Sequence, residues 1–396
     1  MINRPYYLDW LERWKDKDVI KVIVGMRRCG KSTVLQLFKR RLLERGTDPS
    51  HVIDINFERL DASYPLAANE LYSYVADRLQ PGKNYVFLDE VQHVSDFERA
   101  VDGLYVRGDV DLYMTGSNAY FLSGELATLL AGRYVELRVL PLSFAEFHSA
   151  RPDEDPEAAL NRYLSYGGLP YTLQIDSPSD CADYLGGVFN TIVIKDISAR
   201  NPRMDMRAFT NVSTFLADNI GNLTSQQRIS RGMATAGRKV STTTVGSYIE
   251  ALKESYLLYE APRYDVHGRG HLDTLEKYYL GDLGLRFWLL GRDRGDVGHR
   301  IENLVYLELL RRYRSVSVGA MRGGEVDFVA MEDQGCHYYQ VALTVLDEAT
   351  LARELAPLNA IRDNYPKTLL SLDRVGTGDL NGIKHVNLTD WLLCHA

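Results

Sequence analysis

Eight residues near the N-terminus, GMRRCGKS (25–32), have the types and the spacing that bind phosphate groups. Gly25 and Gly30 allow the backbone to turn tightly, so that its N–H groups point inward at phosphate oxygens. Lys31 is then expected to reach the β- and γ-phosphates of a nucleotide, and the Ser32 hydroxyl to take a position on Mg²⁺. The stretch therefore predicts a site for ATP and Mg²⁺.

The segments on either side are those that such a site requires. VIKVIVG (19–25) is typical of a buried strand, and TVLQLFKRRLLERG (33–46) of a helix with its leucines on one face. The helix N-terminus adds a partial positive charge at the phosphates. A glycine-rich turn without a ligand is the alternative, but it leaves the Lys-Ser pair unexplained. The residues predicted to bind the nucleotide are Gly25, Arg27, Arg28, Cys29, Gly30, Lys31, Ser32 and Thr33.

A second motif supplies the acids that this chemistry needs. In NYVFLDEVQ (84–92), an apolar strand ends at Asp89, which is predicted to hold the metal shell of Mg²⁺ together with Ser32. Glu90 follows directly and is predicted to polarise the attacking water. An ordinary solvated loop start is the alternative interpretation of an Asp-Glu pair after a strand.

Two further segments contain candidates for catalysis. DVDLYMTGSN (109–118) is a short strand whose polar end is expected beside the γ-phosphate, where Ser117 or Asn118 would bind the water or the phosphate. A plain turn at Gly116 is the alternative. Arg133, in LLAGRYVELRVLPLSF, is the candidate arginine finger, acting in cis or across a subunit boundary, with a surface arginine as the alternative.

Composition limits the class of protein. The chain has 396 residues, 45% hydrophobic and 25% charged, with a net charge of -7, which argues against a surface that is basic throughout. Four scattered cysteines favour neither zinc nor disulfides. No apolar run is long enough for a membrane span, so a cytoplasmic protein without a membrane partner is expected. For Cys29, packing beneath the loop and an oxidation-sensitive switch are both open.

GMRRCGKS, FLDEVQ, MTGSN, AGRYVELRVLPLSFAEF and YGGLP (166–170) together resemble a family of prokaryotic AAA-like P-loop ATPases. The resemblance covers nearly the whole chain. It implies an ATP-binding and ATP-hydrolysing protein with a parallel-sheet α/β core. It also implies that the C-terminal half contains a domain of unknown function with a restriction-endonuclease-like core.

Four domains are predicted along the chain. The P-loop ATPase domain (1–150) is followed by a helical lid or connector (151–204). Two short helices, a third helix capped by Ser241 and a strand pair then have the order of a winged-helix domain (205–270). The last domain is the restriction-endonuclease-like α/β domain (271–396).

The restriction-endonuclease-like domain is predicted to lack nuclease chemistry. Glu302 and Asp327 stand in the family positions, and Gln340 is a tolerated variant of the second acid. However, the lysine of the acid-x-Lys step is Ala342, which has no charge to assist the attacking water. Lys277 is a possible substitute from elsewhere, although nothing in the sequence demands it.

The sequence thus predicts a slow Mg²⁺-dependent ATPase that acts as a nucleotide-driven switch on its C-terminal domains. One alternative is a DNA-binding regulator or genome-maintenance factor, because residues 200–239 carry a net charge of +5. A weaker alternative is an ATP-gated nuclease. The expected partners are ATP, duplex DNA through the winged helix and a protein partner, and monomer, dimer and ring all remain open.

Overall fold

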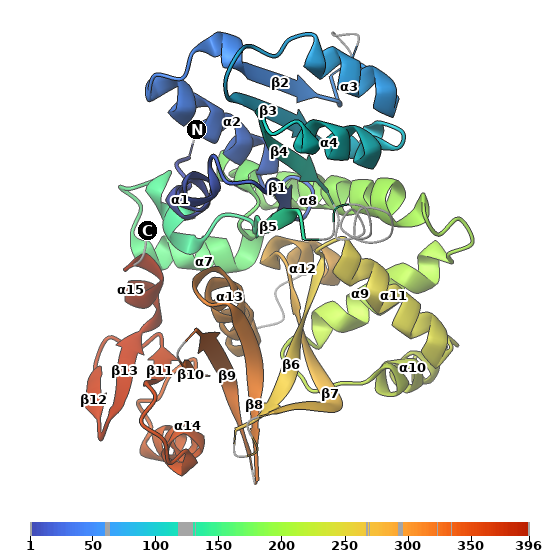
Figure 1. Cartoon of the computed structure of the whole chain (residues 1–396). Helices are drawn as coiled ribbons and strands as arrows, with labels where there is room; N and C mark the ends of the chain where they lie inside the picture. Colours follow the sequence, from blue (N-terminus) through green and yellow to red (C-terminus); the bar gives the residue numbers. More distant parts are fainter. Residues whose placement is uncertain are drawn as a thin grey trace. The chain divides into compact units, whose positions relative to one another are not determined.

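The structure, a computed structural model, describes residues 2–59, 64–117, 130, 132–266, 268, 270–291, 296–322, 324–333 and 335–394. The chain forms two compact units (Figure 1). The first is Met1–Pro141 with Glu254–Tyr256, and the second is Leu142–Lys253 with Leu257–Ala396. Among the described helices, none combines the length and the apolar composition that crossing a membrane requires.

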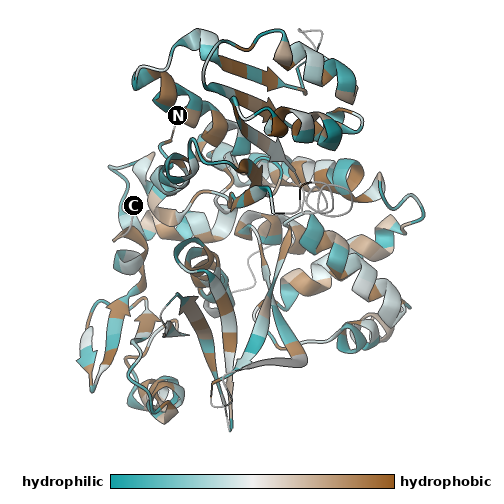
Figure 2. Ribbon diagram, in the orientation of Figure 1, coloured by the Kyte–Doolittle hydropathy of each residue, from teal (hydrophilic) through white to brown (hydrophobic). Residues whose placement is uncertain are grey.

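The first unit contains a five-stranded parallel sheet in the order β2-β3-β4-β1-β5. Every residue of β1, β3 and β4 is buried, as expected for central strands of a parallel sheet with both faces covered. In Figure 2 these strands are mostly brown, whereas the helices alternate between brown and teal. The strands are β1 (Ile20–Val24), β2 (Val52–Asn56), β3 (Asn84–Asp89), β4 (Val110–Gly116) and β5 (Tyr134–Arg138).

Helix α1 precedes β1, and the other described helices of the first unit lie in the connections between strands. Because all five strands are parallel, each connection crosses from one end of the sheet to the other, and the carboxyl ends of the strands meet at one edge. The helices are α1 (Pro5–Trp14), α2 (Lys31–Glu44), η1 (Pro49–His51), α3 (Ala68–Ala76), η2 (Val91–His93) and α4 (Phe97–Val106).

The second unit begins with helices. Its first helix explains the LPLSFAEF motif, because Ser143 and Glu146 form a capping box at the start of α6. The helices of this unit are α6 (Phe144–Ser149), α7 (Pro156–Tyr166), η4 (Pro170–Gln174), α8 (Pro178–Ile192), the π-helical η5 (Val193–Ser198), α9 (Met206–Asp218), α10 (Gln226–Thr235), α11 (Thr242–Glu254), α12 (Leu283–Leu290), α13 (Val297–Arg312), α14 (Glu348–Ala360) and α15 (Leu388–Leu393).

An eight-stranded mixed sheet, in the order β12-β13-β11-β10-β9-β8-β6-β7, forms the rest of the second unit. The pairs β6–β8, β10–β11 and β11–β13 are parallel, and the other neighbours are antiparallel. The strands are β6 (Leu258–Asp265), β7 (Gly270–Leu280), β8 (Ser315–Met321), β9 (Gly324–Glu332), β10 (Gly335–Val341), β11 (Lys367–Ser371), β12 (Gly378–Leu380) and β13 (Ile383–Asn387).

The region predicted as a winged helix has the expected element order, α9, α10, α11 and the hairpin β6–β7. Ser241 caps α11 as expected, since its hydroxyl accepts from the Thr244 N–H at 3.1 Å. The hairpin is part of the large sheet, because β6 pairs with β8 at Arg263 and Val318. The winged-helix domain and the four domain boundaries remain predictions.

The YGGLP motif holds a buried carboxylate of the second unit. Asp282, 1% exposed, accepts from the N–H of Gly168 at 2.7 Å and of Gly284 at 2.8 Å. A Cβ at Gly167 would lie 2.1 Å from the same carboxylate, so this position requires glycine. Burial raises the pKa of Asp282 to about 7, although the backbone N–H groups favour its charged form.

Candidate nucleotide site

The phosphate loop connects β1 to α2 at the carboxyl edge of the first sheet. Gly25 and Gly30 both have positive φ, +147° and +103°. A Cβ at Gly25 would lie only 2.2 Å from the Val139 carbonyl oxygen, so the close approach of two backbone segments requires glycine there. Lys31 begins α2, as the sequence predicts.

Lys31 lies inside the loop and is 4% exposed. Its ammonium donates to the carbonyl oxygens of Gly25 and Met26, at 3.0 and 3.3 Å. It also lies 3.8 Å from a carboxylate oxygen of Glu90. The structure thus brings the predicted phosphate-binding lysine and the predicted catalytic acid together.

Asp89 ends β3 beside the first turn of α2. The Ser32 hydroxyl donates to Asp89 Oδ1 at 3.1 Å, and the Thr115 hydroxyl donates to the same oxygen at 2.6 Å. The other oxygen, Oδ2, accepts from the Asn56 side-chain amide at 2.7 Å. Residues at the ends of β2 and β4 and in the first turn of α2 therefore orient this carboxylate.

Burial raises the pKa of Asp89, whereas the hydrogen bonds from Thr115 and Ser32 oppose the shift. A cation beside Asp89 would favour its charged form. Hard oxygen donors are the ligands that Mg²⁺ prefers, and it usually keeps several waters and phosphate oxygens. Ser32 and Asp89 fit that role. Within the described part of the chain, no cluster of three or more His, Cys, Asp or Glu residues is arranged to bind a metal.

Glu90 adopts a left-handed backbone conformation with φ of 56°, which is uncommon for a residue with a side chain. Its N–H donates to Thr115 Oγ1 at 2.8 Å, and the Gln92 amide donates to its carboxylate. These contacts keep Glu90, 6% exposed, at the site. Such strained residues are common at functional sites.

The other predicted loop residues differ in their surroundings. Arg27 is half-buried and lies 3.4 Å from Glu58, whereas Arg28 is exposed with φ of 66°. Thr33 is half-buried in the first turn of α2. Cys29 is buried, its thiol contacts Val139 O at 3.2 Å, and burial raises its pKa. A protonated thiol packed beneath the loop fits this geometry better than a reactive thiolate.

Of the other predicted catalytic residues, one lies outside the described residues and one does not join this group. Asn118 lies outside the described residues, although its neighbour Ser117 contacts the Gln92 amide at 3.4 Å. Arg133 directly precedes β5, and its carbonyl accepts from Ile20 at the start of β1. It pairs with Asp102 on α4.

The expectation that Arg133 acts in cis therefore needs correction. β1 and β5 are parallel, so Arg133 lies at the amino edge of the sheet and the phosphate loop at the carboxyl edge. Five residues of strand, about 16 Å, separate the two edges. A role across a subunit boundary stays a prediction.

Sequence reasoning missed Thr115 and Asn56. Thr115 lies one position before the Gly116 that was considered as a turn, and Asn56 ends the VIDIN strand. The available signal was that polar residues at the carboxyl ends of neighbouring parallel strands meet at one edge. Only the strand order shows that both flank β3.

A second group of charges lies in the second unit, where Lys277 of β7 is 3% exposed. Its ammonium lies 3.1 Å from Glu302 on α13, and 2.8 and 4.0 Å from Glu325 and Asp327 on β9. We call these four residues the Lys277 cluster. Tyr279 also donates to Glu302 at 2.6 Å.

The Lys277 cluster brings a lysine beside Glu302 and Asp327, the two acids that the sequence predicts for a restriction-endonuclease-like core. Burial, with the charge of Glu302, raises the pKa of Asp327 to about 8. Burial also disfavours the charge of Glu302, but the Lys277 ammonium lowers the pKa of Glu302 below its usual value. Gln340 donates to Glu354 at 3.0 Å and contacts the Asp327 N–H through its oxygen.

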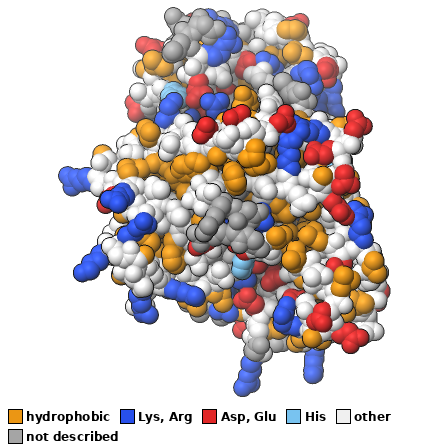
Figure 3. Space-filling view, turned by 180° about the vertical axis from the view of Figure 1, so that it is seen from behind, with side chains coloured by type: hydrophobic (Ala, Val, Ile, Leu, Met, Phe, Trp, Pro, Cys, Tyr) orange, Lys and Arg blue, Asp and Glu red, His pale blue; other side chains and the backbone are white. Residues whose placement is uncertain are grey.

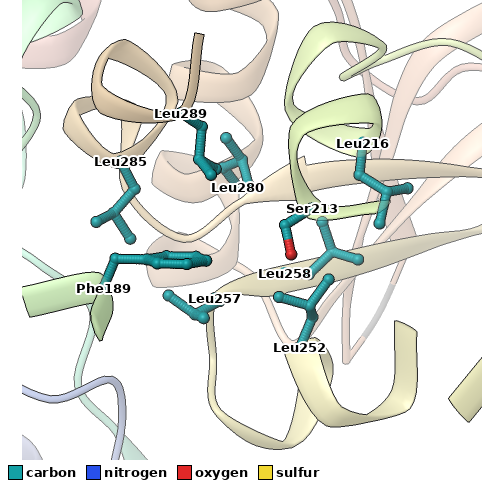
Figure 4. Close-up of a pocket in the computed structure, with 9 residues that line it drawn as sticks. All are labelled: Phe189, Ser213, Leu216, Leu252, Leu257, Leu258, Leu280, Leu285 and Leu289. Carbon is teal, nitrogen blue, oxygen red and sulfur yellow. The ribbon is translucent and has the colours of Figure 1, made fainter. Parts of the chain in front are cut away.

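An apolar cavity of about 10 Å³ also lies in the second unit (Figure 4). The only polar side chain among its lining residues, Ser213, donates to the Phe209 carbonyl at 2.9 Å. A cavity of this size holds about one water molecule, so it is not a nucleotide site. Its lining residues are Phe189, Ser213, Leu216, Leu252, Leu257, Leu258, Leu280, Leu285 and Leu289.

Comparisons with known proteins agree with the fold of the first unit. Residues 17–148 match the model of an AAA domain, and residues 157–296 match a domain of unknown function. The Walker-type ATPase PABY2304 of Pyrococcus abyssi has a similar fold, with a TM-score of 0.50 and 16% identity, over 73% of this chain and 96% of that protein. The first unit is therefore an AAA-like P-loop ATPase domain.

Relatives in other organisms extend over most of the chain. An uncharacterized protein of Haemophilus influenzae is 36% identical over 99% of both chains. The uncharacterized protein MJ1544 of Methanocaldococcus jannaschii is 28% identical, over 74% of this chain and 67% of its own. The chain belongs to the same family of AAA-domain proteins as the Haemophilus protein.

Proposed function

We propose that this protein binds ATP with Mg²⁺ at the phosphate loop and hydrolyses it slowly. In this proposal Lys31 binds the β- and γ-phosphates, and Ser32 with Asp89 would hold Mg²⁺, which neutralises phosphate charge when bound. Glu90 accepts a proton from the attacking water. Thr115 and Asn56 orient Asp89, and Thr115 also fixes the backbone of Glu90.

The observation that carries the proposal is the convergence of four predicted residues at one edge of the sheet. Ser32 contacts Asp89 at 3.1 Å, and Lys31 lies 3.8 Å from Glu90. Turnover is expected to be slow because Arg133 lies at the other edge, so no arginine finger is supplied in cis by that residue. Aligned arginine fingers raise such rates by about 10³–10⁵-fold.

The test is phosphate release and nucleotide binding by the full chain and three variants. Lys31→Ala is expected to abolish ATP binding, whereas Glu90→Gln keeps binding and lowers hydrolysis by about 10²–10⁴-fold. Lys39→Ala, on the same helix but paired with Asp54, is the control and leaves both unchanged. Hydrolysis at the wild-type rate in Glu90→Gln would exclude the role of Glu90.

Chain continuity supports the proposed switch function. Val139 packs against Gly25 and Cys29 of the phosphate loop, and the second unit begins three residues later, at Leu142. We expect the nucleotide state to change hydrogen exchange in α6 and in helices α9–α11. Identical exchange with ADP and with a non-hydrolysable ATP analogue would contradict the switch.

A second candidate function, binding of duplex DNA, is favoured by the charge of α9–α11 and their flanks. All seven basic residues of segment 200–239 are exposed. In Figure 3, Lys and Arg side chains gather along the left edge, which corresponds to the side of α9–α11 in Figure 1. These residues are Arg200, Arg203, Arg207, Arg228, Arg231, Arg238 and Lys239.

Duplex binding is tested by titrating labelled DNA at several salt concentrations. The triple variant Arg228→Gln, Arg231→Gln, Arg238→Gln should weaken binding and lower the slope of log K against log salt by about 0.9 for each lost phosphate contact. Arg40→Gln, on α2 and exposed, is the control. Slow ATP hydrolysis that is indifferent to DNA, without a shift of DNA, would favour a protein partner.

The second unit supports a restriction-endonuclease-like core without nuclease chemistry. Its order α13-β8-β9-β10-α14-β11 joins three antiparallel strands to a parallel fourth, an α/β arrangement that agrees with this proposal. The charge of Lys277 is already satisfied by three carboxylates. Mg²⁺-dependent cutting of DNA that disappears in Asp327→Ala would instead establish the ATP-gated nuclease.

A further inference from the structure

Arg4 lies outside the matched AAA domain but contacts the phosphate loop directly. Its side chain is 2% exposed. Arg4 Nη1 donates to the Cys29 carbonyl at 3.0 Å, and Nη2 donates to the carbonyls of Leu140 and Pro141 at 2.9 and 3.3 Å. One guanidinium therefore joins the loop to the segment that follows β5.

The Cys29 carbonyl is part of the peptide that contains the Gly30 N–H. In a planar trans peptide the C=O and the N–H point in opposite directions. Because Arg4 holds the Cys29 oxygen, the direction of the Gly30 N–H is also fixed. Backbone N–H groups of such a loop are the donors that bind phosphate oxygens.

Further contacts hold both the Arg4 guanidinium and the segment that it binds, 139–141, in place. The guanidinium lies 4.4 Å from the centre of the Tyr7 ring, and the Tyr7 hydroxyl accepts from the Leu140 N–H at 3.1 Å. The Val139 carbonyl accepts from the Cys29 thiol and lies close to Gly25. The segment 139–141 thus supports both ends of the phosphate loop.

We propose that Arg4 is a positioning residue for the nucleotide site, and that the N-terminal helix is a functional part of it. Arg4 acts through the Cys29–Gly30 peptide and presents the Gly30 N–H to a phosphate group. This inference rests on the proposed nucleotide binding and adds a residue beyond the AAA domain at 17–148.

A comparison with Lys31 supports this assignment. Lys31 bonds the carbonyls of Gly25 and Met26 from inside the loop, whereas Arg4 bonds that of Cys29. In the proposed complex Lys31 turns to the phosphates, but Arg4 keeps its carbonyl partners. A buried guanidinium is costly unless hydrogen bonds satisfy it, and an apolar side chain would anchor the helix without that cost.

The test uses the full chain with Arg4→Lys and Arg4→Ala. Lysine keeps the charge but presents one ammonium in place of a fork, so it cannot join both segments in the same way. The affinity for ADP is expected to fall about threefold in Arg4→Lys and about tenfold or more in Arg4→Ala. Arg13→Ala, on the exposed side of the same helix, is the control and keeps wild-type affinity.

One amide reports on the mechanism. Cys29–Gly30 is the only Cys-Gly step in the sequence, so ¹³C-carbonyl cysteine with ¹⁵N-glycine selects the Gly30 N–H alone. Addition of ADP should move this signal strongly downfield in the wild type and less in Arg4→Lys. A purely structural role would lower stability but leave the shift at saturating ADP unchanged.

The outcomes separate this inference from the proposed function. Failure of the wild type to bind ADP would overturn nucleotide binding itself. Wild-type binding that is lost in Lys31→Ala but unchanged in both Arg4 variants would overturn the role of Arg4 alone. If Arg4→Ala does not fold, Arg4→Lys decides, and a wild-type affinity and Gly30 shift in that variant overturn the inference.

Discussion

The phosphate loop and the Lys277 cluster each place a buried lysine beside carboxylates, but the two lysines have different partners. Lys31 bonds two backbone carbonyls and lies 3.8 Å from one carboxylate. Lys277 lies within 4.0 Å of three carboxylates. The first ammonium can exchange weak partners for phosphate oxygens, whereas the second is neutralised by its own protein.

This difference shows that proximity of a lysine and acids does not define a catalytic site. A reacting group must have an interaction that is stronger with the transition state than with its resting partners. The Lys277 cluster is therefore expected to act as a link between β7, α13 and β9. The following predictions test that contrast.

Removing Lys277 should have the largest effect on stability. Lys277→Met leaves buried carboxylates unpaired and is expected to lower the free energy of unfolding by about 3–5 kcal/mol. Lys253→Met is the control, because Lys253 is 30% exposed and its pairs contribute less than about 1 kcal/mol. Urea denaturation followed by hydrogen exchange in β7 and β9 measures both.

A second substitution sharpens the same test. Glu325→Gln in the Lys277→Met background should recover part of the loss, because it removes a carboxylate that Lys277 neutralised. Mg²⁺-dependent cutting of DNA by the wild type that is lost in a Lys277→Met protein of wild-type stability would contradict the structural role.

Stability of the second unit should fall as the pH rises from 5 to 7. The pKa of Asp282 is raised to about 7, so its folded form retains a proton that the unfolded form has lost. That contribution is complete below the unfolded pKa and is lost as the pH rises through about 7. The expected slope is about 1.4 kcal/mol per pH unit at most.

Asp282→Asn should flatten this slope in denaturation curves between pH 5 and 7. Asp347→Asn is the control, because the Thr350 N–H lowers the pKa of Asp347 and its titration lies below this range. An unchanged slope in Asp282→Asn would mean that its backbone N–H partners keep the carboxylate charged throughout.

Thr115→Val should affect the phosphate site more than the fold. Valine preserves the shape but removes the hydroxyl that donates to Asp89 and accepts from Glu90 N–H. Losing these hydrogen bonds is expected to cost about 1–3 kcal/mol of free energy. Part of this cost should raise the barrier to hydrolysis and make it approximately tenfold slower. Thr172→Val, at a buried threonine of the second unit, should leave the rate unchanged.

Arg133→Ala should have the smallest effect. The residue lies at the amino edge of the sheet and pairs with Asp102, so hydrolysis by a dilute monomer is expected to remain at the wild-type rate. The rate per chain is measured over a range of protein concentrations. A rate that rises with concentration only when Arg133 is present would establish a finger in trans.

The sequence by itself determined those elements that can be recognised from residues close together in the chain. The phosphate loop, the strand ending at Asp89 with Glu90 after it, and the Ser241 cap all combine a residue type with a neighbouring periodic segment. Such patterns depend on short-range backbone geometry, so they can be interpreted without knowing the fold. The order of helices before the β6–β7 hairpin is of the same kind.

Only the tertiary structure decided which distant residues meet. Arg4 contacts Leu140 across 136 positions, Thr115 reaches Asp89 through strand order, and Lys277 meets Asp327 because β7 and α13 converge on β9. Arg133 lies at the amino edge of the sheet, away from the phosphate loop, and only the parallel pairing of β1 with β5 shows this. Strand order and register arise from long-range packing, and no local periodicity in the sequence specifies them.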